Sequence, residues 1–189
     1  MDTTREKLLT ATFDEVYSNG YQGASLATIL NTAGVHKGSM YHFFPSKKEM
    51  ALCAIKETIL KKFGERYGYV EHACESGYLE EFYRRLRETA TRDFKRGCPI
   101  ANVVQEMSNI DDDFNGLMKS IYLSFRANIQ SILDKAIQAG ELKACDTTKL
   151  ALYIASVLEG GILSAKATGN VQDYVDVVEE LIAYIEGKR

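Results

Sequence analysis

The stretch SLATILNTAGVHKGSMYHFFPSKKE, from Ser25 to Glu49, decides the fold of this chain. Ser25 can cap a short helix, because its hydroxyl oxygen can accept a hydrogen bond from a free N–H group of the first turn. The apolar residues that follow recur at helical spacing on one face: Leu26, Ile29, Leu30 and Ala33. Gly34 can adopt the left-handed conformation that a tight turn needs. The stretch therefore predicts two short helices joined by a turn, the second from about His36 to Phe43.

The second of these helices divides its side chains between a polar face and an apolar face. The groups expected to point outward are Lys37, Ser39, Tyr41 and His42. The groups expected to pack are Met40, Phe43 and Phe44. This division is typical of a helix-turn-helix, whose second helix enters the DNA major groove. No acidic residue occurs between Gly34 and Ser46, although the whole chain has a net charge of −3. A sequence-specific regulator needs only such a local basic face.

The polar residues of this motif are candidate DNA contacts. Phosphate contacts hold a protein in register on DNA, whereas contacts with base edges read the sequence. Ser25 and Thr28 can offer hydroxyl groups to a phosphate at the N-terminus of the first motif helix. The start of the second helix is where base edges are reached, and Gly38 there lets the backbone approach closely. The expected DNA contacts are Ser25, Thr28, His36, Lys37, Gly38, Ser39, Tyr41, His42, Lys47 and Lys48. The alternative is that these residues form an ordinary solvated surface.

These residues also resemble the DNA-binding region of TetR/AcrR-type bacterial transcription regulators. The matching pieces are Tyr17-Ser18-Asn19-Gly20-Tyr21, Gly23-Ala24-Ser25, Ile29-Leu30, Ala33-Gly34-Val35, Lys37 to Phe44 and Ser46-Lys47-Lys48-Glu49. The resemblance implies a DNA-binding head over residues 1–47 and an effector-binding and dimerisation body over residues 48–189. It also implies a cytoplasmic homodimer that represses from a palindromic double-stranded DNA operator and is released by a small-molecule effector.

The rest of the chain predicts more helices and no sheet, which makes an all-α fold of about nine helices. Outside the motif, the expected helices cover residues 3–19, 45–69, 78–96, 99–110, 111–139, 146–167 and 171–186. With 189 residues and 46% hydrophobic content, the chain can bury a full core. It has no apolar run of about 18 residues and no N-terminal signal pattern, so we expect a cytoplasmic protein without a membrane span.

The last two expected helices each carry an apolar stripe. One stripe consists of Leu152, Ala155, Ser156, Glu159, Ile162 and Leu163. The other consists of Tyr174, Val177, Val178, Leu181, Ile182 and Ile185. Two such helices from each of two chains would form a four-helix bundle. The stripes therefore predict a homodimer through these helices, and the alternative is that they form an intramolecular core.

Cys98 lies between Gly97, which can end one helix, and Pro99, which suits the first position of the next. The positive end of that helix and the basic residues just before it would favour a thiolate, which reacts with oxidants and electrophiles. The segments 97–108 and 159–166 are similar to segments of a subset of the family, in which some members sense reactive species through this cysteine. The resemblance implies a sensor at Cys98, and an ammonium of Lys166 that approached its sulfur would lower the thiol pKa further. The alternative is a buried cysteine that only packs.

Several apolar side chains of the C-terminal part could line an effector cavity or simply form core: Phe94, Met107, Phe114, Tyr122, Phe125 and Tyr153. Of these, Tyr122 and Phe125 are our candidate effector contacts besides Cys98 and Lys166. Two histidines of the motif do not share a helical face and have no third ligand nearby, and the four cysteines form no CxxC pair. We therefore expect neither a metal site nor a cofactor.

Two other classes of function stay open. A small helical enzyme would need a catalytic motif, but the chain has neither a glycine-rich phosphate loop nor a placed pair of carboxylates. The run Asp111-Asp112-Asp113 is better explained as the start of a helix, where negative charge meets the positive end of the dipole. A DNA-binding protein without effector control is the nearer alternative. An architectural protein of that kind would carry broad basic faces, which this acidic chain lacks.

Overall fold

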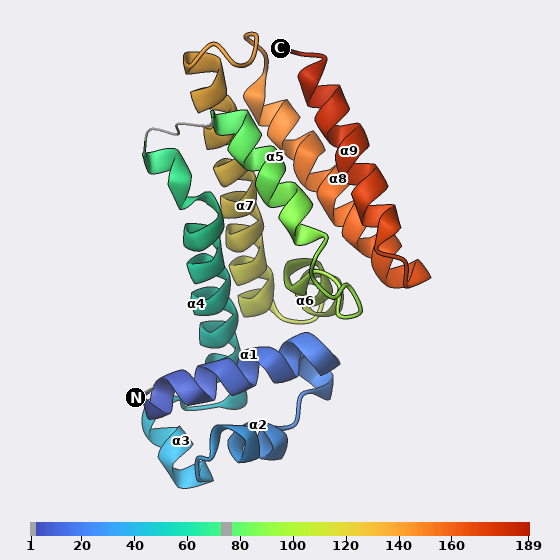
Figure 1. Cartoon of the computed structure of the whole chain (residues 1–189). Coiled ribbons are helices and arrows are strands. Elements are labelled where there is room, and N and C mark those ends of the chain that lie inside the picture. Colours follow the sequence, from blue (N-terminus) through green and yellow to red (C-terminus); the bar gives the residue numbers. More distant parts are fainter. Residues whose placement is uncertain (1–2, 73–76) are drawn as a thin grey trace. The chain divides into compact units, whose positions relative to one another are not determined.

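The computed structural model describes residues 3–72 and 77–189. In these ranges it contains nine α-helices, one short 3₁₀ helix and no strand, so the all-α prediction is confirmed (Figure 1). The helices are α1 (Thr4–Gly23), α2 (Leu26–Ala33), α3 (Lys37–Phe43), α4 (Lys47–Tyr67), η1 (Gly68–Glu71), α5 (Tyr78–Thr89), α6 (Pro99–Met107), α7 (Asp112–Gln138), α8 (Thr147–Thr168) and α9 (Gln172–Glu186). They form two compact units, Met1–Lys62 with Pro99–Ile121 and Phe63–Cys98 with Tyr122–Arg189.

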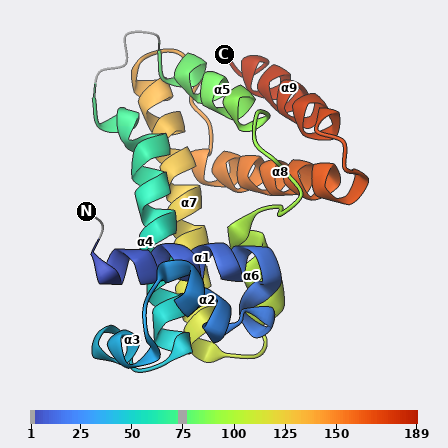
Figure 2. The ribbon, with the colours of Figure 1, turned by 60° about the horizontal axis from the view of Figure 1, so that its bottom comes forward.

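The first unit contains α1 to α3, most of α4, α6 and the start of α7. A capping box starts α1: the Thr3 side chain accepts the N–H of Glu6, and the Glu6 carboxylate accepts the N–H of Thr3. α1 contacts α2, α3 and α6 (Figure 2). The buried side chains of this unit include Leu8, Phe13, Ile29, Met40, Met50, Ile55 and Phe114. Each such burial stabilises the fold by about 1.5–3 kcal/mol, and together they fix α2 and α3 on α1.

α1 extends further than the sequence indicated. The expected end is present as a kink, because Gly20 has φ 73° and ψ 166°. Glycine adopts positive φ without steric cost. The chain then continues helically to Gly23 before Ser25 begins the next helix. This extra turn is too short to give a periodic signal in the sequence.

The second unit contains α5, α8 and α9 with the remaining parts of α4 and α7. α8 and α9 lie side by side, and α9 also contacts α5 (Figure 1). Its buried side chains include Phe82, Leu86, Ile129, Leu133, Ile154, Tyr174 and Ile185. The apolar faces of these helices therefore form one core inside the protomer.

The helix predicted up to Arg96 is shorter in the structure, where α5 ends at Thr89. The following residues form turns instead, and Phe94 is buried with its ring centroid 4.8 Å from that of Tyr174. Burial of this aromatic ring favours leaving the helix, and the contact joins residues that are far apart in the sequence. Local periodicity could not reveal it.

The two predicted dimer stripes differ in how far their residues are buried within the protomer. In α9, the stripe residues Tyr174, Val178, Leu181, Ile182 and Ile185 are buried within the protomer. The interface prediction is wrong for them, because they pack in the core that α9 shares with α8 and α5. The α8 stripe is divided. Ala155 and Ile162 are buried at 0% and 8% exposure, so the interface prediction is wrong for them too, whereas Leu152 and Leu163 are 42% and 58% exposed. Tyr153 on α8 and Tyr184 on α9 are also exposed.

The expectation about membrane segments needs one qualification at α8. Among the described residues, α8 is the single helix long and apolar enough to cross a membrane. Of the apolar stretch of α8 that meets this criterion, 44% is buried within the chain. A core helix of a globular protein can have the same length and apolar composition.

Candidate nucleic-acid interface and sensor cysteine

The helix-turn-helix predicted from the sequence is present. The Ser25 hydroxyl oxygen accepts the N–H of Thr28 at 3.3 Å and caps α2. Gly34 ends α2 in a left-handed conformation, with φ 65° and ψ 35°. His36 then occupies the position before α3 with extended backbone and no side-chain cap. The short turn sets the direction of α3, and the left-handed backbone at Gly34 explains why a glycine stands there.

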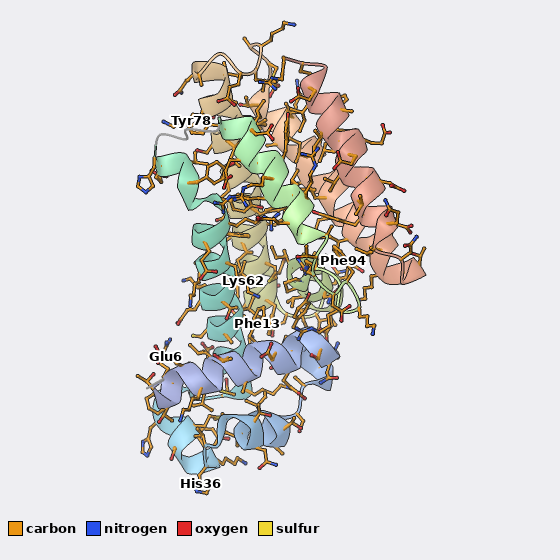
Figure 3. The ribbon with its side chains drawn as sticks, in the orientation of Figure 1. Glu6, Phe13, His36, Lys62, Tyr78 and Phe94 are labelled. Carbon is orange, nitrogen blue, oxygen red and sulfur yellow. The ribbon has the colours of Figure 1, made fainter. Side chains whose placement is uncertain are left out.

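Seven of the ten expected DNA contacts are exposed around α3 and α2: Thr28, His36, Lys37, Gly38, Ser39, Tyr41 and His42. Figure 3 shows His36 at the end of the head remote from α1. Met40 and Phe44 are buried, as expected, at 0% and 3% exposure. Phe43, which was expected to pack, is 45% exposed, so that prediction is wrong. α3 thus fixes itself to the head through two buried side chains and turns its polar groups outward.

A lysine and a tyrosine lie next to each other on the outward side of α3. Lys37 Nζ lies 6.0 Å from the ring centroid of Tyr41, one turn further along the helix. At this separation the ring weakly attracts the ammonium while both groups stay accessible. Such a surface can donate hydrogen bonds to phosphates and to base edges.

Lys47 and Lys48 differ from the other expected contacts because both are half-buried and engaged within the first unit. Lys47 Nζ donates to the carbonyl oxygen of Ala24 at 2.6 Å and lies 4.6 Å from the ring centroid of Tyr21. Lys48 Nζ lies 2.7 Å from Asp111 Oδ2 and 2.6 Å from Asp113 Oδ2. A phosphate could bind either ammonium only by sharing it with these partners.

Lys48 and Asp111 change each other's pKa. Hydrogen bonds from its ammonium to Asp111 and Asp113 raise the pKa of Lys48. The same ammonium, followed by N–H groups of the first turn of α7, lowers the pKa of Asp111. Lys48 and Asp111 therefore both stay charged at neutral pH. Sequence reasoning missed these partners, because the aspartates lie far along the chain and no spacing rule relates them to Lys48.

Cys98 is 8% exposed and therefore buried. Burial was expected in the second of the two interpretations of its sequence context. Its thiol donates a hydrogen bond to Glu159 Oε1, with Sγ and Oε1 3.1 Å apart. The hydrogen bond uses the thiol proton, so forming a thiolate would remove it. Burial raises the pKa of Glu159, while the hydrogen bond from Cys98 and the charge of Arg92 oppose that shift. The other carboxylate oxygen, Oε2, is buried without a hydrogen-bond partner in the described chain.

The remaining effector candidates lie in the same unit. Tyr122 is half-buried, and desolvation raises its pKa, with Glu159 as the next cause. Phe125 is buried, and its ring centroid lies 6.2 Å from that of Tyr122 and 6.0 Å from that of Phe63. Lys166 is exposed on α8. Sequence reasoning missed Glu159 as the acceptor for Cys98, although it placed Glu159 in a dimer stripe and in the segment 159–166 that resembles the cysteine-sensing subset.

Two of the three other cysteines lie in the described part of the chain. Cys53 is half-buried and Cys145 is exposed, and both are free thiols. Cys74 lies outside the described residues. Over residues 3–72 and 77–189, no group of three or more His, Cys, Asp or Glu side chains could hold a metal ion.

Two family models match this chain. The model described as bacterial regulatory proteins, tetR family, matches residues 8–53, and that of the tetracyclin repressor-like C-terminal domain matches residues 78–181. The chain belongs to the tetR family. It is thus a DNA-binding transcriptional regulator, and the first match contains the helix-turn-helix described above.

Curated relatives agree with this assignment. The chain is 31% identical to an uncharacterized HTH-type transcriptional regulator of Lactococcus lactis, over 67% of this chain and 66% of that protein. It is 29% identical to the transcriptional regulator AcuR of Cereibacter sphaeroides, over 85% of this chain and 75% of AcuR. It is 24% identical to the transcriptional repressor NemR of Escherichia coli, over 97% of this chain and 92% of NemR.

Solved structures share the fold. A regulatory protein TetR from Rhodobacter sphaeroides has a TM-score of 0.84 at 25% identity, covering 96% of this chain and 98% of its own. The reduced form of E. coli NemR also has a TM-score of 0.84, at 21% identity and 94% coverage of both chains. The second similarity concerns the fold alone.

Proposed function

We propose that this regulator is a cytoplasmic homodimeric repressor that occupies a palindromic operator and leaves it when its body binds or reacts with an effector. The observation that supports DNA reading most directly is the face of α3. There His36, Lys37 and Ser39 are exposed at the start of the helix, while Met40 is fully buried beneath them. This is the arrangement that a recognition helix needs to insert its first turn into the major groove.

The DNA contacts in this proposal are the exposed groups of α3 with Ser25 and Thr28. The Ser25 oxygen already accepts a hydrogen bond, but its hydroxyl proton can still be donated to a phosphate. Lys47 would reach a phosphate after leaving the Ala24 carbonyl. We keep residues 1–47 as the reading head and residues 48–189 as the body, with the addition that α6 packs against α1.

Dimerisation is supported by the outer surface of α8 and α9. Leu152, Tyr153, Leu163 and Tyr184 remain exposed there, and less than half of the apolar window of α8 is buried within its own chain. Large exposed apolar side chains on neighbouring helices are typical of a protein interface. A second copy placed there would bring two heads to two half-sites of a palindrome.

Effector control is proposed at Cys98, with Tyr122 and Phe125 as neighbouring contacts. The thiol already has a proton acceptor in Glu159, and the unpaired Oε2 of Glu159 offers a second acceptor to a ligand. The relative NemR is named a repressor, and its solved structure is that of a reduced form. An electrophile or oxidant that modifies the sulfur would break the hydrogen bond to Glu159 and disturb the start of α6, which follows Cys98 directly.

The test uses the reduced protein and an operator fragment selected from its own genome. Binding would be measured before and after treatment with N-ethylmaleimide and with hydrogen peroxide. We expect treatment to weaken binding by at least about tenfold in the parent protein, which corresponds to about 1.4 kcal/mol. The Cys98→Ala variant should keep its binding under the same treatment. If Cys98→Ala and the parent responded equally, the sensor would be elsewhere, and if no genomic fragment were selected, the regulator proposal would fail.

A further inference from the structure

The carboxylate of Glu106, on α6, is bound to the end of α1. Its Oε2 accepts the N–H of Tyr21 at 2.8 Å, and its Oε1 accepts the N–H of Gln22 at 2.9 Å. These N–H groups are available because the kink at Gly20 interrupts the helical hydrogen bonding. A Cβ atom at residue 20 would lie 2.7 Å from Glu106 Oε2, so the close approach requires glycine. Hydrogen bonds to an ionised carboxylate are about twice as strong as neutral ones.

The start of α7 holds the start of α4 in the same unit. Lys48 Nζ lies between Asp111 Oδ2 and Asp113 Oδ2, at 2.7 and 2.6 Å. Asp111 is itself fixed, because its Oδ1 accepts the N–H groups of Asp113 and Phe114 at 3.0 and 3.2 Å. The ammonium of Lys48 is therefore held by groups that the first turn of α7 keeps in place.

An aromatic contact lies between these two attachments. The ring centroid of Tyr21 is 4.5 Å from that of Phe114 on α7 and 4.6 Å from Lys47 Nζ on α4. The same lysine donates to the carbonyl of Ala24, just before α2. The segment that leads into α2 is thus in contact with both α7 and α4.

These contacts occupy the two chain segments that carry the helix-turn-helix. α2 and α3 are attached to the rest of the first unit through residues 20–24 on one side and residues 44–48 on the other. Glu106 holds the first segment, and Asp111 with Asp113 holds the second. A displacement of α6 would therefore pull on the first connection of the motif, and a displacement of the start of α7 would pull on the second.

We propose that Glu106, Asp111 and Asp113 form a carboxylate clamp that positions the helix-turn-helix for operator binding. In this proposal Lys48 serves the clamp and is not a phosphate contact. The clamp rests on the proposed function only for the operator that the helix-turn-helix binds. The positioning itself concerns the first unit alone.

The simpler interpretation is that Lys48 and the aspartates form a surface salt bridge without functional weight, as many exposed ion pairs do. The two interpretations differ in what the neutral variants would change. Glu106→Gln removes the charge with little change of shape, and the asparagine of Asp111→Asn can still cap α7. Asp112→Asn is the control, because Asp112 is exposed in the same turn and its replacement removes one negative charge there, as Glu106→Gln removes one from α6.

The experiment measures amide hydrogen exchange and DNA binding of these full-length variants. We expect Glu106→Gln and the double variant Asp111→Asn/Asp113→Asn to speed exchange in residues 20–43 by about tenfold or more, while α8 and α9 keep parental exchange. Both should weaken operator binding by about tenfold and binding to non-specific DNA much less. Asp112→Asn should leave exchange unchanged and should not weaken binding.

Lys48→Met separates the clamp from a phosphate contact. The clamp predicts weaker operator binding with an unchanged slope of log affinity against log salt. It also predicts that Lys48→Met combined with the aspartate double variant is no worse than either alone, since all three act together. A slope reduced by about 0.9 would mean that Lys48 neutralises a phosphate, and the proposal would be overturned.

Two further results would also overturn it: parental exchange in residues 20–43 of both clamp variants, or equal effects of Asp112→Asn. If a clamp variant lost exchange protection over the whole chain, it would be unfolded and Glu106→Asp, which keeps the charge, would be measured in its place. We expect Glu106→Asp also to speed exchange in residues 20–43. If the parent protein selected no operator, the proposed function would fail, and the exchange measurements would decide the clamp by themselves.

Discussion

The face of α3 and the surroundings of Cys98 are built in opposite ways. On α3 the polar groups come from one short stretch of sequence and are exposed to solvent. Around Cys98 the groups are buried and come from distant segments, because the acceptor Glu159 lies on α8. The exposed face of α3 can thus be encoded locally, whereas the surroundings of Cys98 depend on tertiary packing.

The largest expected effect concerns the support of the α3 face. Met40 is fully buried beneath the exposed groups, so Met40→Ala would leave a cavity in the small core of the head. We expect the head to lose about 2–5 kcal/mol of stability, which is enough to abolish operator binding at moderate temperature. Amide exchange of α2 and α3 and a binding titration would measure this. Phe43→Ala is the control, because Phe43 is 45% exposed and should cost much less stability.

A smaller effect is expected when the face itself is changed and its support is kept. Lys37→Ala removes an exposed ammonium from the first turn of α3. We expect a loss of about 1–3 kcal/mol in operator binding, without a change in thermal unfolding. A titration at several salt concentrations would show whether Lys37 neutralises a phosphate or reads a base. Lys143→Ala, which changes an exposed lysine of the second unit, should leave operator binding unchanged.

The smallest effect is expected at the buried site and appears as a pH dependence. Burial raises the pKa of Glu159 above its ordinary value of 4.5, so the folded chain holds this proton at a pH where the unfolded chain has lost it. The contribution of Glu159 to stability is therefore fully present below pH 4.5 and decreases as the pH rises through the raised pKa. It amounts to about 1.4 kcal/mol per unit of pKa shift.

Glu159→Gln should remove that dependence, since an amide does not titrate in this range. Denaturant unfolding of the parent and of Glu159→Gln, from acidic to neutral pH, would measure the difference. We expect the difference in unfolding free energy between the two proteins to shift in favour of Glu159→Gln as the pH rises. A parallel pair of curves would contradict the assignment of a raised pKa to Glu159.

The sequence was sufficient where residues that act together are neighbours. The cap at Ser25, the turn at Gly34 and the exposed side of α3 all follow from spacings within one motif. The same reasoning failed even there for Phe43, because a single ring at the end of a short helix can turn either way. Local patterns thus predicted the helix-turn-helix and most of its outward groups.

The sequence was insufficient where the partner lies far along the chain. The hydrogen bonds from Tyr21 and Gln22 to Glu106, and that from Cys98 to Glu159, join different helices or the turns beside them. The early end of α5 and the burial of the α9 stripe have the same origin, since both depend on tertiary contacts. Periodicity identifies an apolar face but does not say whether the protomer or a second copy covers it.

The most direct test of the account is a footprint of the reduced protein on its selected operator fragment. A dimer that reads DNA through two copies of α3 should protect two half-sites whose centres lie about 10 base pairs, or a multiple of that spacing, apart. Lys37→Ala should weaken the protection of both half-sites equally. A single protected site, or continuous protection without symmetry, would contradict the proposal of a dimeric helix-turn-helix repressor.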